Sequence, residues 1–299
     1  MKPYFLISVL FSVMASGCAA QTATPFEYDR ALPLDIRELD QIEHDGYTEL
    51  DISFSSPAGG RVPALLLLPS TGQAPYPAVI VQHGMPGSRR GVATFAAEYA
   101  RRGAVAIAIT APWARPNDEP RANIVSFTEQ DAADQIQLIQ DLRRAIDLLQ
   151  ARPDVDPDRI AYSGGSYGGA MGGLLAGVET RITAYALWVG DGGLVAHFTG
   201  PEDARGPLSR LSESRRTAWL DAMEPIEPAR WVGRAAPAEL LFQNGRQDRL
   251  VPPADAETYH AAASEPKTIL WYDEGHGLNQ QAREDRRKWI SKRIGLDKQ

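Results

Sequence analysis

Apolar positions follow two different patterns along this chain, and the two patterns predict two kinds of β-strand. Between Tyr47 and Phe54 apolar and polar residues alternate, which is typical of an antiparallel strand with one buried face. After a turn at 57–60, a second such strand is expected at 62–68, so the two would form a hairpin at a sheet edge. Farther along, the predicted strands are apolar on both faces, as in a parallel sheet covered by helices. They lie at 78–81, 104–109, 159–162, 182–189, 238–242 and 268–271.

Helical periodicity fills the gaps between these strands. The longest predicted helix runs from about residue 129 to residue 151 and carries a single apolar stripe. The stripe consists of Ile136, Ile139, Leu142, Ile146 and Leu149. Other helices are expected at 35–42, 93–102, 254–263 and 279–293. Strands that alternate with helices predict an α/β fold, in which helices cover both faces of a doubly wound, mostly parallel sheet.

One segment interrupts this alternation. Residues 194–233 contain no expected strand, although strands are expected on both sides of them. The segment holds four prolines and has helical patches around 208–223. An insertion of this size is typical of a cap that folds over the edge of a sheet. We therefore expect a small helical cap at about 194–233.

The first twenty residues have the character of an export signal. Lys2 supplies a positive charge, and the mainly apolar run at 4–14 is too short to span a bilayer. The run ends at 15–18 in Ala-Ser-Gly-Cys, which resembles a bacterial lipoprotein box with the lipid on Cys18. Ala15 replaces the usual leucine, so ordinary cleavage near Ala20 stays open. Either way, we expect an exported protein, periplasmic or attached to the outer membrane through Cys18.

These observations predict three parts in the chain: a signal or lipoprotein segment at 1–20, a polar tether at 21–45, and one domain at 46–299 that includes the cap. A single cysteine allows no internal disulfide. The hydrophobic content of 43% and charged content of 23% are those of a globular protein, and the net charge of −7 argues against nucleic acid as a partner. No His, Asp and Glu cluster has the spacing of metal ligands, so neither a metal nor another cofactor is expected.

The stretch most suggestive of chemistry lies between an expected strand and an expected helix. It contains Gly164-x-Ser166-x-Gly168, and a serine on so sharp a turn projects its hydroxyl outward. A phosphate-binding turn is the alternative, but the stretch lacks the Gly-Lys-Ser/Thr ending of a phosphate loop. Ser166 is therefore a candidate nucleophile.

A serine nucleophile needs a base, and the base needs an orienting acid. Of the five histidines, His276 follows the last expected strand in a loop flanked by glycines, which makes it the candidate base. Asp248 lies in a turn just after the preceding strand and is the preferred acid. Asp191, which follows the strand at 182–189, is the rival acid.

The tetrahedral intermediate of acyl transfer also needs two N–H donors. One is expected from the backbone amide of Tyr167, directly after the serine, and the other from the loop after the strand at 78–81. In that loop Met85 is the natural donor, because Pro86 has no N–H.

These motifs together resemble the α/β-hydrolase superfamily: His83-Gly84, the stretch from Asp156-Pro-Asp-Arg to Ser166-Tyr-Gly-Gly169, Asn244 to Pro252, and Gly275-His276. The serine motif is similar to those of dienelactone hydrolases and prolyl oligopeptidases. The former use a cysteine nucleophile, however, and the latter carry a propeller domain for which 299 residues leave no room. The resemblance implies a serine esterase that cleaves small-molecule esters or lactones. The alternatives are an exopeptidase or amidase of the prolyl-oligopeptidase type and a non-catalytic binding lipoprotein.

Residues for the substrate pocket are suggested only by position. His83, Trp113 and Arg115 follow strand ends and are candidates for its lining, with Arg115 suited to an acidic substrate. Four aromatic residues flank or occupy the insertion and could form an apolar acyl site, although packing in the core would explain them equally well. They are Trp188, Phe198, Trp219 and Trp231.

Overall fold

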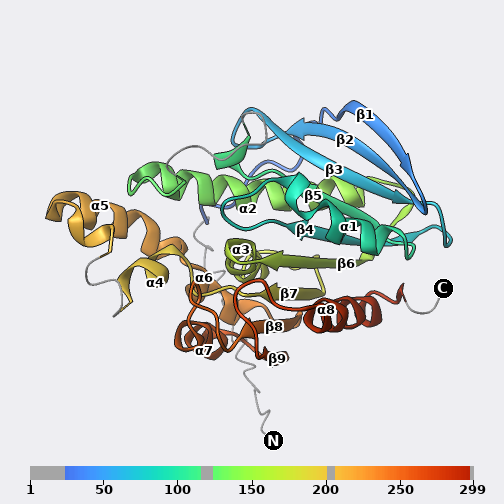
Figure 1. Ribbon diagram of the computed structural model, residues 1–299. Helices are drawn as coiled ribbons and strands as arrows, with labels where there is room; N and C mark the ends of the chain where they lie inside the picture. Colours follow the sequence, from blue (N-terminus) through green and yellow to red (C-terminus); the bar gives the residue numbers. More distant parts are fainter. Residues whose placement is uncertain (1–23, 116–123, 201–205, 297–299) are drawn as a thin grey trace, which may run out of the picture.

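The computed structural model describes residues 24–115, 124–200 and 206–296. The expected export segment, with Cys18, lies outside the described residues. The described strands form one sheet in the order β1-β2-β3-β5-β4-β6-β7-β8-β9 (Figure 1). Among the described helices, none combines the length and the apolar character needed to cross a membrane.

The sheet has an antiparallel edge and a parallel body. β1 (Arg37–His44), β2 (Tyr47–Ser55) and β3 (Arg61–Pro69) pair antiparallel, and β3 pairs in the same way with β5 (Val105–Ile109). The remaining pairs are parallel and bring in β4 (Tyr76–Gln82), β6 (Val155–Gly165), β7 (Ala184–Trp188), β8 (Glu239–Gly245) and β9 (Lys267–Tyr272). The expected N-terminal hairpin and the mostly parallel sheet are both confirmed.

The helix predicted at 35–42 is wrong, because this segment is the edge strand β1. Ile36, Leu39 and Ile42 have helical spacing, yet all three are exposed, and Leu39 is 62% accessible. Backbone pairing with β2, interrupted by one irregularity between Glu38 and Asp40, outweighs that local pattern. The part of the expected tether before β1 is also docked on the domain, since Phe26 is fully buried.

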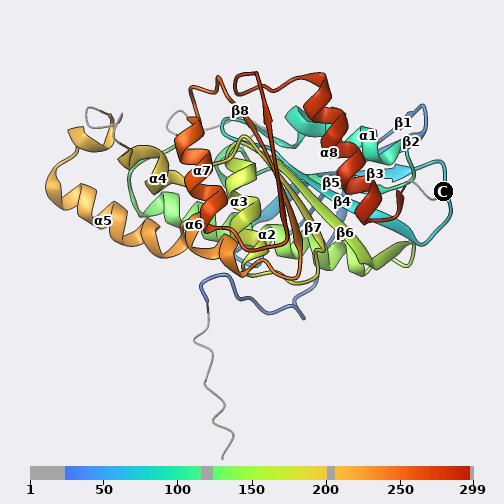
Figure 2. The ribbon, with the colours of Figure 1, turned by 90° about the horizontal axis from the view of Figure 1, so that it is seen from below.

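Helices cover both faces of the sheet (Figure 2). α1 (Ala93–Ala100) and α8 (Gln280–Arg293) contribute to the core on one face. α2 (Glu129–Gln150), α3 (Tyr167–Ala176) and α7 (Pro253–Ala262) contribute to the core on the other. The arrangement is that of a doubly wound sheet, and it places the carboxyl ends of the parallel strands at one edge of the molecule.

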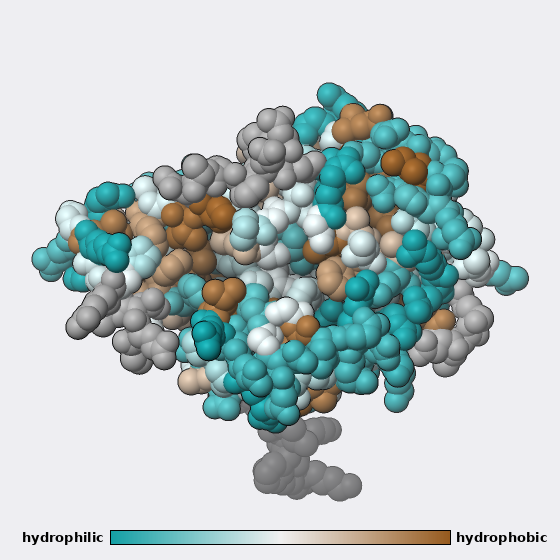
Figure 3. All heavy atoms as spheres, in the orientation of Figure 1, coloured by the Kyte–Doolittle hydropathy of each residue, from teal (hydrophilic) through white to brown (hydrophobic). Residues whose placement is uncertain are grey.

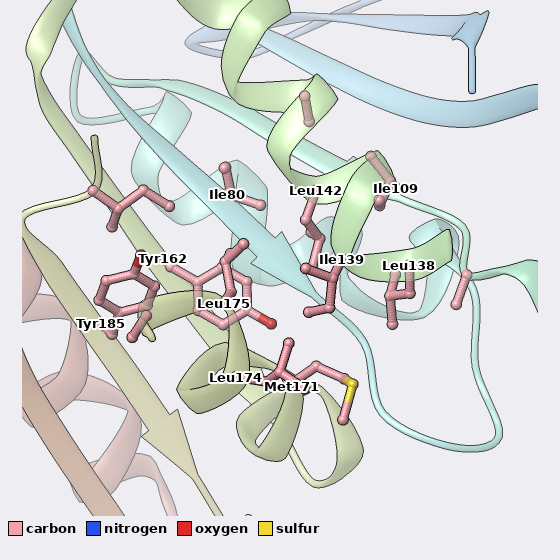
Figure 4. Packing of buried hydrophobic residues seen from close by; sticks show 14 of the residues in the cluster. Ile80, Ile109, Leu138, Ile139, Leu142, Tyr162, Met171, Leu174, Leu175 and Tyr185 are labelled. Carbon is pink, nitrogen blue, oxygen red and sulfur yellow. The ribbon is translucent and has the colours of Figure 1, made fainter. Parts of the chain in front are cut away.

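The packing beneath α3 gives the serine turn a rigid base. Side chains of α2 and α3 interdigitate over β4, β6 and β7, and those labelled in Figure 4 are all fully buried or nearly so. From α3 they include Met171, Leu174 and Leu175, which lie against Tyr162 of β6. Each fully buried side chain of this size contributes about 1.5–3 kcal/mol relative to its exposed state. The N-terminus of α3, where Ser166 lies, is therefore held firmly against the sheet.

The described part of the insertion is helical, as expected. It comprises α4 (Leu194–Thr199), α5 (Glu213–Met223) and α6 (Pro228–Trp231), with single turns of 3₁₀-helix at 208–210, 224–226 and 232–234. α4 and α5 stand at one end of the sheet, at the left of Figure 1. In the same orientation, hydrophobic side chains gather where this cap meets the rest of the molecule (Figure 3).

Candidate active site

Ser166 occupies a sharp turn between β6 and α3. Its backbone angles, φ 55° and ψ −126°, lie in a region that residues with side chains rarely adopt. Strain of this kind costs on the order of 1–3 kcal/mol and persists only where the surroundings enforce it. Here the Ser166 N–H donates to the Trp188 carbonyl at 2.9 Å, and the N–H of Gly169 donates to the Ser166 carbonyl at 2.7 Å. The conformation is thus fixed from both sides, and the hydroxyl projects away from the sheet.

Two glycines permit the close packing around this turn. A Cβ on Gly168 would lie 2.6 Å from the carbonyl oxygen of Gln82. A Cβ on Gly84, in the loop after β4, would lie 2.8 Å from the Cβ of Ser166. Neither distance is compatible with a larger residue, so glycine is required for the β4 loop to approach the serine.

His276 links Ser166 to Asp248 through two hydrogen bonds. Its Nε2 lies 3.0 Å from Ser166 Oγ, and its Nδ1 lies 2.8 Å from Asp248 Oδ2. A carboxylate can only accept, so the imidazole carries its proton on Nδ1 and offers the Nε2 lone pair to the serine hydroxyl. The three residues come from the turn after β6, the loop after β8 and the loop after β9. Residues far apart in the sequence therefore meet at one edge of the sheet.

The surroundings of Asp248 keep its carboxyl group ionised. Burial raises its pKa, but the hydrogen bond from His276, the amides of Val251 and Leu250, and the charge of the imidazole outweigh burial and lower the pKa below its ordinary value. The side chain is fully buried, and its Oδ1 accepts the Leu250 and Val251 amides at 2.9 and 3.0 Å. One carboxylate oxygen is thus fixed by the backbone, and the other is aimed at the histidine.

The sequence predicts an oxyanion hole that is formed by two backbone amides beside Ser166. The Met85 and Tyr167 residues both line the cavity next to the serine, and among the described residues neither amide has an acceptor. His83 fixes the Met85 loop. Its Nε2 accepts the Ala111 amide at 3.1 Å, so its proton lies on Nδ1, which donates to the Gly84 carbonyl at 2.8 Å. The β4 loop is thereby tied to the loop after β5.

The cavity has a volume of about 250 Å³ and opens beside Ser166. Most of its described lining is apolar, with Met85 and Tyr167 near the serine and Asp191 and His197 as polar members. The remaining lining consists of Pro86, Ile124, Val125, Leu194, Phe198 and Leu250. Of the four aromatic residues considered from the sequence, only Phe198 is among the described lining residues.

The three residues suggested for the pocket lining from strand-end positions serve other contacts. His83 is 3% exposed and holds the loop that carries Met85. Trp113 is 1% exposed and packs edge-on against Tyr167, with ring centroids 5.3 Å apart. Arg115 forms an ion pair with the buried Asp141. Burial raises the pKa of Asp141, although the Arg115 guanidinium acts in the opposite direction. A buried carboxylate needs such a cation, so Arg115 supports the core and not the cavity.

The rival acid, Asp191, pairs with a different histidine. Its Oδ2 lies 2.9 Å from His197 Nδ1, and its Oδ1 accepts the Gly193 amide at 3.1 Å. This pair escaped sequence reasoning, because nothing in the insertion's pattern aims His197 at the strand end that carries Asp191. Glu227 lies close by and accepts the amides of Val195 and Ala196. Even so, no group of three or more His, Cys, Asp or Glu side chains in the described ranges is arranged to hold a metal ion.

Comparison with protein families gives two matches, each covering more than half of the chain. The prolyl oligopeptidase family matches residues 132–294, and the acetyl xylan esterase family matches residues 33–189. The first range contains Ser166, Asp248 and His276, whereas the second contains the Met85 loop and Ser166. No curated protein matches the chain.

Solved structures share the fold at low sequence identity. An acetyl xylan esterase from Paenibacillus sp. R4 superposes with a TM-score of 0.71 at 20% identity, over 87% of this chain and 89% of that one. One from Thermoanaerobacterium sp. JW/SL YS485 gives 0.68 at 17% identity, over 91% of both chains. A putative dienelactone hydrolase from Klebsiella pneumoniae subsp. pneumoniae MGH 78578 gives 0.58 at 18%, over 81% and 96%. The α/β-hydrolase fold expected from the sequence is confirmed.

Proposed function

Because the chain belongs to the acetyl xylan esterase and prolyl oligopeptidase families, it is a carboxylic ester hydrolase, and we propose that it works through an acyl-enzyme on Ser166. The observation that carries this proposal is the pair of hydrogen bonds that joins Ser166 to His276 and His276 to Asp248, at 3.0 and 2.8 Å. A hydroxyl at neutral pH needs such a base, and the base needs such an acid. The substrate is a small-molecule ester or lactone.

In the first half of the reaction, Ser166 Oγ attacks the ester carbonyl while His276 Nε2 accepts its proton. Asp248, held ionised and fixed by two backbone amides, stabilises the imidazolium that forms. The carbonyl oxygen becomes an oxyanion between the Met85 and Tyr167 amides. The C–O bond to the alcohol then breaks, and His276 donates its proton to the departing oxygen. The acyl group remains on Ser166.

In the second half, water replaces the alcohol. His276 Nε2 takes a proton from the water as the water oxygen attacks the acyl-enzyme carbonyl, and the same two amides bind the second oxyanion. Collapse returns the proton from His276 to Ser166 Oγ and releases the carboxylic acid. Every proton transfer thus passes through one nitrogen, Nε2 of His276.

Replacement of Ser166 by alanine tests the assignment. The variant should hydrolyse p-nitrophenyl acetate more slowly by a factor on the order of 10⁶ in kcat, as for other serine hydrolases that lose their nucleophile. A fluorophosphonate probe should label the wild type at Ser166 and leave the variant unlabelled. Unchanged turnover in the variant would remove Ser166 from the mechanism. Absence of both labelling and ester hydrolysis in the wild type would instead support a binding protein.

The choice between ester and peptide bonds needs a separate measurement, since the chain matches a family named for oligopeptidases. We expect kcat/KM for short acyl esters to exceed that for aminoacyl p-nitroanilides, because the cavity lining is mostly apolar. Faster cleavage of the anilides would favour the exopeptidase alternative and would leave the roles of the three catalytic residues unchanged.

We also propose that the protein is exported and carries a lipid on Cys18, as its N-terminal sequence suggests. Mass spectrometry of the mature N-terminus would show a diacylglyceryl group on Cys18 if this is correct. An unmodified N-terminus near Gln21 would indicate ordinary signal cleavage, with a periplasmic enzyme as the product.

A further inference from the structure

The cavity beside Ser166 is much larger than an acetyl group requires. Its 250 Å³ exceeds the roughly 150 Å³ of an apolar cavity that binds benzene. At about 30 Å³ for each water-sized group, the space corresponds to roughly eight such groups. The apolar lining by side chains such as Val125, Leu194 and Phe198 favours a hydrocarbon occupant.

The acyl part of the ester is the part that fits there. His276 donates its proton to the alcohol, so the alcohol departs on the side of His276. That residue is not among the described residues that line the cavity, and its side chain is 25% exposed. Ser166, Met85 and Tyr167, which surround the acyl carbon in the proposed reaction, do line it. The acyl chain therefore points into the cavity, and the alcohol faces solvent.

Three anchors shape the cap over this space, and the second of them lies within the cap itself. His197 on α4 pairs with Asp191 at the end of β7, at 2.9 Å. Within the cap, the Glu227 carboxyl group accepts the amides of Val195 and Ala196 at 3.0 and 3.3 Å. Phe198 packs edge-on against Phe127 and Trp219, with ring centroids 5.1 and 6.3 Å apart.

The third anchor extends into the body of the domain, because the Trp219 indole N–H donates to Asp131 at the start of α2 at 2.8 Å. The roof of the cavity is thus preformed, and its volume is a built feature of the fold.

The polar residues of the lining also limit the charge that the acyl group can carry. Asp191 lies at the wall of the cavity, where its Oδ2 meets His197 Nδ1 at 2.9 Å. An acyl group with its own carboxylate would be repelled there and would lose its hydration without gaining a partner cation. A neutral acyl group has no such cost.

We propose that this hydrolase acts on esters of bulky, neutral, apolar acids, with an aromatic ring or a chain of about six to eight carbons held under the cap. The inference rests on the proposed acyl-enzyme function and specifies its substrate class. Because each buried methylene contributes about 0.8 kcal/mol, kcat/KM should rise about fourfold for each one added. From acetate to hexanoate this amounts to a factor on the order of 10².

The test is a series of p-nitrophenyl esters with one leaving group: acetate, butyrate, hexanoate, octanoate, benzoate and hemisuccinate. We expect hexanoate, octanoate and benzoate each to exceed acetate by at least about 10²-fold in kcat/KM, and the hemisuccinate to fall below butyrate. In a second series of hexanoates, a change of alcohol from methyl to glucosyl should alter kcat/KM less than about tenfold, because that side is open.

A variant that fills the cavity gives the specific control. Val125 lies in a bend outside the helices and strands, so Val125→Trp should reduce the cavity without disturbing an element. We expect the ratio of kcat/KM for hexanoate to kcat/KM for acetate to fall at least about tenfold. Leu39→Trp, on the exposed edge strand, is the matched control and should leave this ratio unchanged. If Val125→Trp fails to fold, Phe198→Ala should shift the preference toward longer chains.

The outcomes separate this inference from the proposed function. Preference for acetate, or an equal loss on all esters in Val125→Trp, would overturn the bulky acyl group. If Ser166 is nevertheless labelled and Ser166→Ala abolishes acetate hydrolysis, the acyl-enzyme mechanism stands. If no ester is cleaved and Ser166 is not labelled, the proposed function fails and the inference fails with it.

Discussion

Two aspartate–histidine pairs lie at the carboxyl ends of neighbouring strands in this molecule. Asp191 follows β7 and pairs with His197, whereas Asp248 follows β8 and pairs with His276. In both pairs Nδ1 meets Oδ2, at 2.9 and 2.8 Å. The Asp–His contact is nearly identical in the two pairs. An Asp–His pair by itself therefore does not identify a catalytic site.

The difference lies in what each pair contacts next. His276 reaches Ser166 Oγ from a loop flanked by glycines, whereas His197 belongs to α4 and joins the cap to the sheet. Asp248 is fully buried and accepts two backbone amides, whereas Asp191 accepts the single amide of Gly193. We interpret one pair as catalytic and the other as an anchor of the cavity roof.

The largest expected effect comes from removal of the two histidines in turn. His276→Ala should lower kcat for p-nitrophenyl hexanoate by a factor on the order of 10⁶, because Ser166 loses its base. His197→Ala should lower kcat less than about tenfold and should instead raise KM, because it loosens the cap. Steady-state kinetics on both variants measure the contrast. Comparable losses of kcat would mean that His197 also takes part in the chemistry.

The two aspartates give the next largest contrast. Asp248→Asn should lower kcat about 10⁴-fold, because an amide in place of the carboxylate stabilises the wrong imidazole tautomer. Asp191→Asn keeps the size of the side chain and should cost less than about tenfold. A loss in Asp191→Asn that equals the loss in Asp248→Asn would show that the assignment of the acid is incomplete.

The sequence predicts the pair of Asp248 and His276 but not the pair of Asp191 and His197. Ser166, Asp248 and His276 each follow a strand, and the order of strands in a doubly wound sheet brings their positions together. The partnership of Asp191 with His197 depends on how the cap folds, and helical periodicity does not specify that. For this reason the sequence leaves Asp191 as a rival acid, and its contact with His197 in the structure assigns it to the cap.

The same limit explains the other differences between sequence and structure. β1 has the apolar spacing of a helix, and only its pairing with β2 makes it a strand. Arg115 follows a strand end next to the site, but its partner Asp141 lies on α2, 26 residues later. Local pattern predicted elements and strand ends well, whereas pairs formed across elements had to be seen in three dimensions.

The smallest expected effect concerns the dependence of stability on pH. Glu227 and Asp248 should change stability in opposite directions as pH rises. Burial raises the pKa of Glu227 to about 8, opposed by the Val195 and Ala196 amides and reinforced by the charge of Asp191. The carboxyl is therefore protonated in the folded protein at a pH where it is ionised in the unfolded chain. Its contribution to stability is fully present below the ordinary glutamate pKa of about 4.3 and is lost as pH rises to about 8. Asp248 has the opposite sign: its lowered pKa contributes stability above the ordinary aspartate value, which is lost as pH falls.

Glu227→Gln should therefore have nearly the wild-type melting temperature at pH 5, where glutamine resembles the protonated acid. At pH 9 the wild type must hold a buried carboxylate, and the variant should melt higher by on the order of 5 °C. Glu224→Gln, an exposed residue of the same cap, is the matched control and should show no pH-dependent difference from the wild type. Thermal unfolding at pH 5, 7 and 9 measures all three proteins. If the difference between Glu227→Gln and the wild type stays constant across this range, Glu227 does not titrate between the two states, and the cap anchor next to Asp191 is an ionised carboxylate.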